Sequence, residues 1–347
     1  MIRRPLGKTG IEVSACSFGC GPIPELMTGE PREEQRALVE HALAQGINWF
    51  DTAASYGEGS SEQNLGRALR ELDCSREVHL ATKVRLMPDQ LGDIPGNVRR
   101  SVEQSLRALE VQQVTLLQLH NAVTGKQQDE PTSVSPGDVL RPGGILDAMQ
   151  ELQQEGLVAH LGLTGIGHAA ALREVIQEGG FATIQAPYNL VNPTAGRTAR
   201  AGFTEADYGQ ILKDCAAQQM GVFAIRVFAG GALLDRPPAG HTFRTRFFPL
   251  DLYQRDLARS SRITGRLGDM APDQAALRFV LSEPLVSSAI IGFSHNVNDF
   301  ADTATYQSQN LDWVVRYTRE LATASGYSVK PAKFTTMTDY GLQVGSY

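Results

Sequence analysis

The chain has 347 residues, of which 42% are hydrophobic and 20% charged, a composition that suits one large globular domain or two of medium size. Its formal net charge of −6 argues against nucleic acid as a partner, because nucleic-acid-binding surfaces are usually basic. No apolar run approaches the roughly 20 residues that span a bilayer, and the N-terminal "MIRRPLGKTG" lacks the apolar stretch of a signal peptide. We therefore expect no membrane segment.

The cysteines carry little information about function. There are four, Cys16, Cys20, Cys74 and Cys215, too few for a disulfide framework in a chain of this length. Their spacing forms no C-x-x-C motif, and no nearby histidine cluster completes a zinc site. We expect reduced thiols, a cytoplasmic location and no bound metal.

Short apolar runs alternate with amphipathic patterns through most of the chain. Each run is followed by Gly, Ser, Asn or Pro, which is typical of strands buried on both faces. The predicted strands span residues 15–19, 48–51, 79–82, 114–119, 159–163, 183–186, 222–225 and 288–291. Helices are predicted over residues 32–46, 96–110, 143–156 and 204–221, and Pro31 and Gly46 mark the ends of the first.

Eight strands alternating with helices predict a closed α/β fold, the (β/α)8 TIM barrel, with an open doubly wound sheet as the alternative. The open sheet is disfavoured because no G-x-G-x-x-G follows the first strand. "GKTG" at residues 7–10, followed by alternating Ile11 and Val13, predicts an N-terminal β-hairpin that closes the barrel bottom. We expect a single domain over 1–347, with the hairpin in 1–14, the barrel in 15–308 and a C-terminal tail in 309–347.

The active site of such a barrel is built from the carboxyl ends of its strands. The second predicted strand ends in Asp51, the third leads into Lys83 in "HLATKV", and the fourth leads into His120 in "LLQLHN". Tyr56 lies in the loop after the second strand. Three consecutive strands therefore bring Asp, Lys and His to one rim, with a Tyr beside them.

This combination of groups suits proton transfer to a developing oxyanion. A phenol normally ionises near pH 10, and a neighbouring ammonium favours the phenolate. A carboxylate keeps the ammonium charged and oriented, and an imidazole can orient a carbonyl oxygen or share the proton. Reduction of a carbonyl by hydride needs these functions. Hydrolysis in a barrel fits less well, because the set has no nucleophile–base pair and no evident metal ligands.

Several segments resemble the aldo-keto reductase superfamily, from about residue 5 to about residue 308. They are "RPLGKTGIEVS", "INWFDTAASYGEGSSEQNLGRAL", "LATKV" and "LLQLHN", which occur in the family's order and spacing. The resemblance implies that Tyr56 is the general acid, that Asp51 and Lys83 tune it, and that His120 orients the carbonyl.

The resemblance also implies where a nicotinamide dinucleotide binds. In "LGLTGIG" and "IQAPYNL", Thr164 and Gln185 would hold the carboxamide and Tyr188 would stack on the ring, while Asn121 would reach the same ring. In "IRVFAGGAL" and "IIGFSHNVNDFADT", the implied contacts to the pyrophosphate and the adenosine phosphate are Phe228, Ala229, Gly231, Gly292, Ser294 and Asn298.

The resemblance implies an enzyme that uses NADP(H) in preference to NAD(H) and interconverts a small aldehyde or ketone with its alcohol. No Arg occurs between residues 279 and 315, so we expect a modest preference for the 2′-phosphate. The alternative function is a nucleotide-binding regulatory subunit with vestigial catalysis. The sequence specifies neither the substrate nor the oligomeric state.

Overall fold

The computed structural model describes residues 1–21, 25–29, 32–236, 248–268, 270–294 and 308–310. Eight parallel strands follow one another around a barrel, and the pairing of the last with the seventh and the first closes it. These strands are β3 (Cys16–Gly19), β4 (Trp49–Asp51), β5 (His79–Val84), β6 (Val114–Leu119), β7 (Val158–Thr164), β8 (Thr183–Pro187), β9 (Gly221–Ile225) and β10 (Ser288–Ser294). The predicted TIM barrel is confirmed, and the open sheet is excluded by the β9–β10 pairing.

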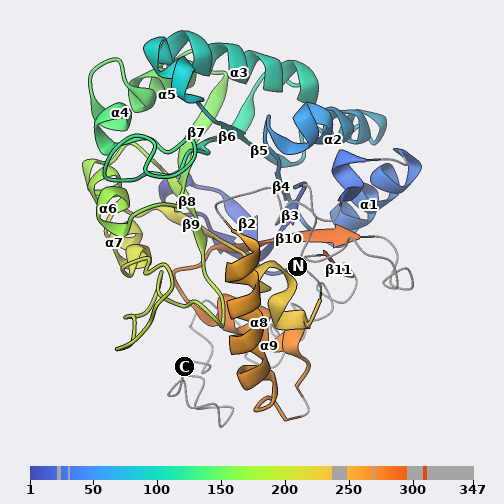
Figure 1. Cartoon of the computed structure of the whole chain (residues 1–347). Helices are drawn as coiled ribbons and strands as arrows, with labels where there is room; N and C mark the ends of the chain where they lie inside the picture. The colour runs from blue at the N-terminus through green and yellow to red at the C-terminus, as the bar shows by residue number, and fades with distance from the viewer. Residues whose placement is uncertain (22–24, 30–31, 237–247, 269, 295–307, 311–347) are drawn as a thin grey trace.

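Helices surround the strands (Figure 1). They are α1 (Arg32–Ala44), α2 (Ser60–Glu71), α3 (Ile94–Leu109), α4 (Pro136–Leu140), α5 (Ile145–Gln154), α6 (Ala169–Glu178), α7 (Ile211–Ala217), α8 (Leu250–Thr264) and α9 (Pro272–Ser282). Short 3-10 turns are η1 (Gly7–Thr9), η2 (Glu25–Thr28), η3 (Tyr56–Gly59), η4 (Pro88–Gly92) and η5 (Ala229–Leu234). A further strand, β11 (Ser308–Asn310), pairs with β10 where the barrel was predicted to end. The predicted tail lies almost entirely outside the described residues.

The helix predicted over residues 204–221 is wrong in extent, because α7 spans only Ile211–Ala217. Gly209 and Gln210 both adopt φ near +60°, outside the helical region. The preceding loop holds this segment: Thr194 accepts hydrogen bonds from the backbone N–H of Tyr208 through its hydroxyl (3.0 Å) and of Gln210 through its carbonyl (2.8 Å). Long-range hydrogen bonds therefore override a sequence with a helical pattern.

The N-terminal hairpin closes the barrel bottom as predicted. Strands β1 (Arg3–Pro5) and β2 (Glu12–Ser14) are antiparallel and joined through η1. Gly7 has φ +52° and lies so close to β9 that an added Cβ would be 2.2 Å from the backbone N of Gly221. Leu6 and Val13 are fully buried against inward-facing side chains at the lower ends of the strands. We call this apolar cluster the floor; its barrel residues are Trp49, Ala81, Leu116 and Phe223.

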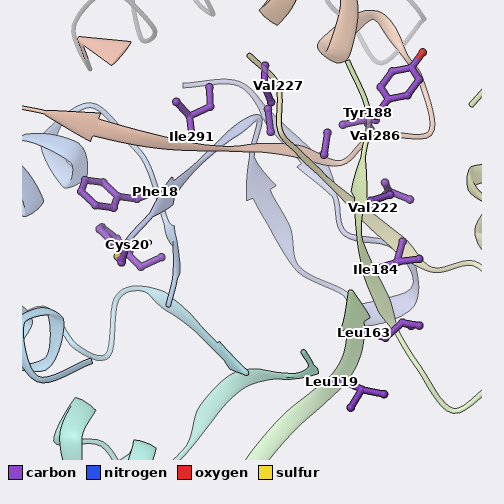
Figure 2. Packing of buried hydrophobic residues seen from close by; sticks show 14 of the residues in the cluster. Phe18, Cys20, Leu119, Leu163, Ile184, Tyr188, Val222, Val227, Val286 and Ile291 are labelled. Atoms are coloured by element: carbon purple, nitrogen blue, oxygen red, sulfur yellow. The ribbon is translucent and has the colours of Figure 1, made fainter. Parts of the chain in front are cut away.

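The outer side of the barrel wall is a second apolar layer. Figure 2 shows Leu119, Leu163, Ile184 and Val222 following one another along four neighbouring strands, where they contact the surrounding helices. All four side chains are at most 1% exposed. Because side chains alternate along a strand, the residues between them face the barrel interior. Only the inward-facing residues at the upper ends of the strands can therefore reach the carboxyl end of the barrel interior.

Candidate active site

The four residues predicted to be catalytic meet at the carboxyl end of the barrel. Asp51 ends β4, Lys83 lies in β5, His120 follows β6, and Tyr56 begins η3 in the loop after β4. Asp51 and Lys83 are at most 3% exposed, whereas Tyr56 and His120 are partly exposed. The arrangement places the charged pair inside the barrel and the two rings at its mouth.

The ammonium of Lys83 has an acceptor for each of its three N–H groups. Lys83 Nζ donates to Asp51 Oδ1 (2.5 Å), to the carbonyl oxygen of Thr52 (2.7 Å) and to Tyr56 Oη (3.1 Å). Burial by itself lowers the pKa of Lys83, but Asp51 and Tyr56 outweigh it and raise the pKa above its usual 10.5. Lys83 therefore stays charged, and its N–H bond to Tyr56 leaves the phenol's own proton free to be donated elsewhere.

A tight turn positions Tyr56. The three residues after it, Gly57, Glu58 and Gly59, all have φ between +55° and +93°. A Cβ on Gly57 would lie 2.2 Å from Ser60 Oγ and 2.8 Å from Thr28 Cβ, so both the backbone angle and the space require glycine. The turn brings the Tyr56 ring over Lys83, with Nζ 4.6 Å from the ring centroid.

His120 lies edge-on to Tyr56, with the ring centroids 5.7 Å apart at an interplanar angle of 82°. Its backbone N–H donates to the carbonyl of Val84 (2.8 Å), which fixes it beside the end of β5. Burial, followed by the charges of Arg85 and Lys83, lowers the pKa of His120 well below its usual 6.5. The imidazole is therefore neutral at physiological pH and able to donate one N–H hydrogen bond.

Two residues at the site were not predicted. Gln118 donates from Nε2 to Asp51 Oδ2 (3.1 Å), and the charge of Arg85 helps to lower the pKa of His120. Each lies two residues from a predicted catalytic residue in the same strand or just after it, as the quoted segments "LLQLHN" and "ATKVRL" show. The two-residue repeat of a strand was the signal that could have found them.

Of the residues predicted to hold the nicotinamide, Thr164 and Gln185 lie together, paired across β7 and β8. Thr164 Oγ1 donates to the carbonyl of Leu119 (3.0 Å), and Gln185 Nε2 donates to Asp51 Oδ2. The bond from Gln185 leaves its amide oxygen as the acceptor for a ligand N–H. Both side chains are nearly buried at the upper end of the barrel.

Asn121 and Tyr188 are placed elsewhere, and their predicted contacts to the ring need correction. Asn121 is fully buried, and its amide nitrogen donates to the carbonyls of Leu86 (2.7 Å) and Thr132 (2.5 Å), so both its donors are used. The fully buried Tyr188 ring stacks on Phe279 of α9, with centroids 5.0 Å apart. It belongs to the apolar cluster outside the barrel wall, part of which is drawn in Figure 2.

Of the residues predicted to contact the phosphates, all but Asn298 lie within the described part of the chain. Phe228, Ala229 and Gly231 lie at the carboxyl end of β9, where Ala229, Gly230 and Gly231 all have positive φ and form the turn η5. Gly292 lies in β10, paired with Gly19 of β3. Ser294 ends β10, and Asn298 lies outside the described residues.

Within the described ranges, no group of three or more His, Cys, Asp or Glu side chains is placed to hold a metal ion. All four cysteines are buried and free. In the same part of the chain, no helix has the length and apolar character needed to cross a bilayer.

This fold and rim identify the class of protein. The model of the Aldo/keto reductase family matches residues 17–312, so the chain belongs to this family of oxidoreductases. L-galactose dehydrogenase of Arabidopsis thaliana is 32% identical over 164 residues, which are 47% of this chain and 48% of that protein. Protein tas of Escherichia coli (strain K12) is 27% identical over 316 residues, covering 82% and 87% of the two chains.

Solved structures share the fold. The holo form of aldo-keto reductase AKR11C1 from Bacillus halodurans superposes with a TM-score of 0.62 at 21% identity, covering 92% of this chain and 91% of that one. At this identity the likeness shows the architecture and leaves the substrate open.

Proposed function

We propose that this protein interconverts an aldehyde or ketone with its alcohol by hydride transfer with a nicotinamide dinucleotide, and that Tyr56 is the general acid and base. The observation that carries the proposal is the position of Lys83 Nζ, 2.5 Å from Asp51 Oδ1 and 3.1 Å from Tyr56 Oη. An ammonium held in this way stabilises the phenolate that remains when Tyr56 gives up its proton.

Each residue has a separate task in this mechanism. Tyr56 donates its proton to the carbonyl oxygen as negative charge develops there. Lys83 keeps its charge through Asp51 and is directed at the phenol oxygen by Thr52 and Asp51. His120, as a neutral imidazole, donates a hydrogen bond that orients the same carbonyl oxygen. In the reverse direction the phenolate accepts the proton of the alcohol.

The rim fits a nicotinamide dinucleotide. Thr164 and Gln185 offer a hydroxyl oxygen and an amide oxygen side by side on β7 and β8. Because Thr164 Oγ1 donates its proton to the carbonyl of Leu119 and Gln185 Nε2 donates to Asp51, both oxygens are acceptors, which suits the NH2 group of a carboxamide. The turn with positive φ at Ala229, Gly230 and Gly231 turns its backbone without bulky side chains, which suits close approach of a pyrophosphate. When bound, the dinucleotide supplies or accepts the hydride.

The test is a fluorescence titration with NADPH and NADH, followed by a panel of carbonyl substrates with the preferred nucleotide. We expect micromolar or tighter binding and measurable turnover of at least one small aldehyde. Binding of neither nucleotide would contradict the proposal. Tight binding without turnover of any substrate would instead favour the regulatory subunit.

We propose NADP(H) as the preferred cofactor, with a smaller preference than an arginine would give. Backbone N–H groups at a helix N-terminus can hold a phosphate without a cation. Arg substituted at Asn298 adds bidentate bonds to a phosphate. We therefore expect Asn298→Arg to tighten NADPH and leave NADH nearly unchanged, measured by the same titration. Tighter binding of NADH than NADPH by the wild type would overturn this preference and leave the reductase assignment intact.

A further inference from the structure

The carboxylate of Asp51 is held from two sides. Its Oδ1 atom accepts from Lys83, and its Oδ2 atom accepts from the amide nitrogens of Gln118 and Gln185. Asp51 is only 3% exposed, so these donors replace the water that would otherwise solvate the charge. The two glutamines share one acceptor, but their positions differ.

Gln185 and Gln118 differ in what else they can reach. Gln185 is paired with Thr164, so its amide belongs to the group that we propose for the nicotinamide carboxamide. Gln118 is fully buried inside the barrel, and His120 lies two residues nearer the rim in the same inward-facing row. Gln118 therefore lies level with Lys83, its register partner on β5, and one layer of inward-facing side chains below His120.

The amide of Gln118 is oriented by the carboxylate. A carboxylate accepts hydrogen bonds only, so the Nε2 side must face Asp51. Among the described residues, Gln118 Oε1 has no hydrogen-bond partner. A buried polar atom without a partner costs stability, whereas a methionine would fill a similar volume without that cost. Among the described residues, the hydrogen bond to Asp51 is the polar contact that Gln118 makes, and we infer that it compensates for the unpaired Oε1 atom.

The neighbouring strand makes room for Gln118. Gly162 of β7 is its register partner, and a Cβ at Gly162 would lie 3.2 Å from Gln118 Cγ and 2.3 Å from Thr183 Oγ1. The absence of a side chain at this position lets Gln118 extend across the barrel interior toward Asp51.

We propose that Gln118 is a positioning residue of the reaction, which holds the Asp51 carboxylate directed at Lys83. This inference rests on the proposed function. Through Asp51, Gln118 keeps the Lys83 ammonium charged and aimed at the phenol oxygen of Tyr56. It does so independently of the cofactor, whereas the amide of Gln185 is shared between Asp51 and the proposed carboxamide site.

The experiment compares Gln118→Met with Gln185→Met as its matched control, since both remove one donor to the same carboxylate oxygen. We expect Gln118→Met to lower kcat by roughly 10- to 100-fold, the effect of one hydrogen bond to a charged group. Its KM and nucleotide Kd should stay within about twofold of wild type. The acid limb of its pH–rate profile should move to higher pH, because the ionised carboxylate has lost a donor. Gln185→Met should weaken nucleotide binding as well.

Two results would overturn the inference. One is a wild-type kcat and pH profile for Gln118→Met. The other is a loss confined to nucleotide Kd, as for a cofactor contact. If Gln118→Met does not fold, Gln118→Glu serves instead, since it keeps the shape and lacks the donor when ionised. Its activity should fall at neutral pH and recover toward lower pH, where a shared proton restores the hydrogen bond. No recovery would contradict the role.

An experiment that does not depend on enzyme activity distinguishes failure of this inference from failure of the proposed function. Urea unfolding of wild type and Gln118→Met is compared between pH 4 and 8. The stability that Gln118 gives to the charged carboxylate is lost on protonation, so the deficit of the variant should be largest near neutral pH and shrink toward pH 4. If wild type reduces no carbonyl, the proposed function fails, and this comparison still decides whether Gln118 supports the charge of Asp51. Parallel unfolding curves would overturn that support.

Discussion

The two ends of the barrel interior are built on the same strands and have opposite character. At the floor, Trp49 and Ala81 pack with Leu6 and Val13 of the hairpin in an apolar cluster. Two residues further along β4 and β5, the side chains are Asp51 and Lys83. Two residues of strand span only about 7 Å, so the interior changes from apolar to charged within one layer of side chains.

The apolar floor and the charged rim contribute differently to stability and to chemistry. Floor side chains gain free energy by leaving water, and they need no hydrogen-bond network. Rim side chains lose hydration and must recover it from one another, as Lys83 does through three acceptors. Changes at the floor should therefore reduce stability and spare the rate per folded molecule, while changes at the rim should alter the rate and its pH dependence.

The largest expected effect is at the rim, for Lys83→Met. Removing the ammonium leaves the Asp51 carboxylate buried without its counter-charge, which should cost about 3–5 kcal/mol of unfolding free energy. Alcohol oxidation should fall, and any residual activity should move to higher pH, because nothing then stabilises the phenolate. Urea unfolding and pH–rate profiles measure the two effects.

The control for this change is Lys83→Met combined with Asp51→Asn, which removes both charges. We expect the double variant to recover much of the lost stability and none of the activity. An unchanged pH profile for Lys83→Met would mean that Lys83 is only a charge at the rim.

At the floor, Leu116→Ala should show the reverse pattern. Leu116 is fully buried among the floor residues, so its truncation should cost about 2–5 kcal/mol. The rate per folded molecule should remain near wild type, measured by active-site titration with the preferred nucleotide. A large fall in kcat without loss of stability would break the separation of floor and rim.

A smaller effect is expected from His120→Gln on stability at acid pH. The folded protein holds the pKa of His120 well below the 6.5 expected when unfolded, so the unfolded state binds more protons below that pH. The stability that the neutral imidazole contributes is present above about pH 6.5 and is lost as pH falls toward the folded pKa. The variant should lose less stability than wild type between pH 6.5 and 5 in urea titrations. Equal losses of stability in the two proteins would contradict a lowered pKa of His120.

The smallest predicted effect lies behind the rim, at Glu62 of α2. Burial raises the pKa of Glu62 above 4.5, although hydrogen bonds from Thr82 and Ser105 oppose the shift. A raised carboxyl pKa lowers stability as pH rises through the folded pKa. Glu62→Gln should therefore gain in stability relative to wild type as pH increases from about 4.5, with Thr82 still donating to the new amide oxygen. Thermal unfolding across pH 4–8 tests this, and a difference independent of pH would contradict it.

Much of the fold and the meeting of the rim residues could be predicted because both depend on local pattern. Eight short apolar runs gave the strands, and the residues that end them, Asp51, Lys83 and His120, are brought together by the closure of a parallel barrel. The same reasoning failed where long-range contacts decide the outcome. The hydrogen bonds that Thr194 accepts from the backbone of Tyr208 and Gln210 delay the start of α7, and no local sequence pattern predicts them.

Side-chain direction explains the remaining errors. "IQAPYNL" places Tyr188 just beyond the strand that carries Gln185, but the position of the ring depends on Phe279, about ninety residues further along the chain. Asn121 follows His120 directly, and its amide is used to join Leu86 to Thr132. Gln118 was missed because glutamine has no chemical signature of its own, although its alternation with His120 indicated an inward direction.

The central claim is that Tyr56 donates the proton to the carbonyl oxygen, while Lys83 and Asp51 stabilise its phenolate and His120 orients the carbonyl. Its most direct test is Tyr56→Phe, measured by following reduced nucleotide oxidation in the presence of the best carbonyl substrate. Tyr208→Phe is the control, because it removes another phenol, which is buried and has no hydrogen bond to Lys83 among those described. We predict a loss of about 10²–10⁴ in rate for Tyr56→Phe, with nucleotide affinity close to wild type, and no comparable loss for the control. Retention of most of the turnover by Tyr56→Phe would contradict the account.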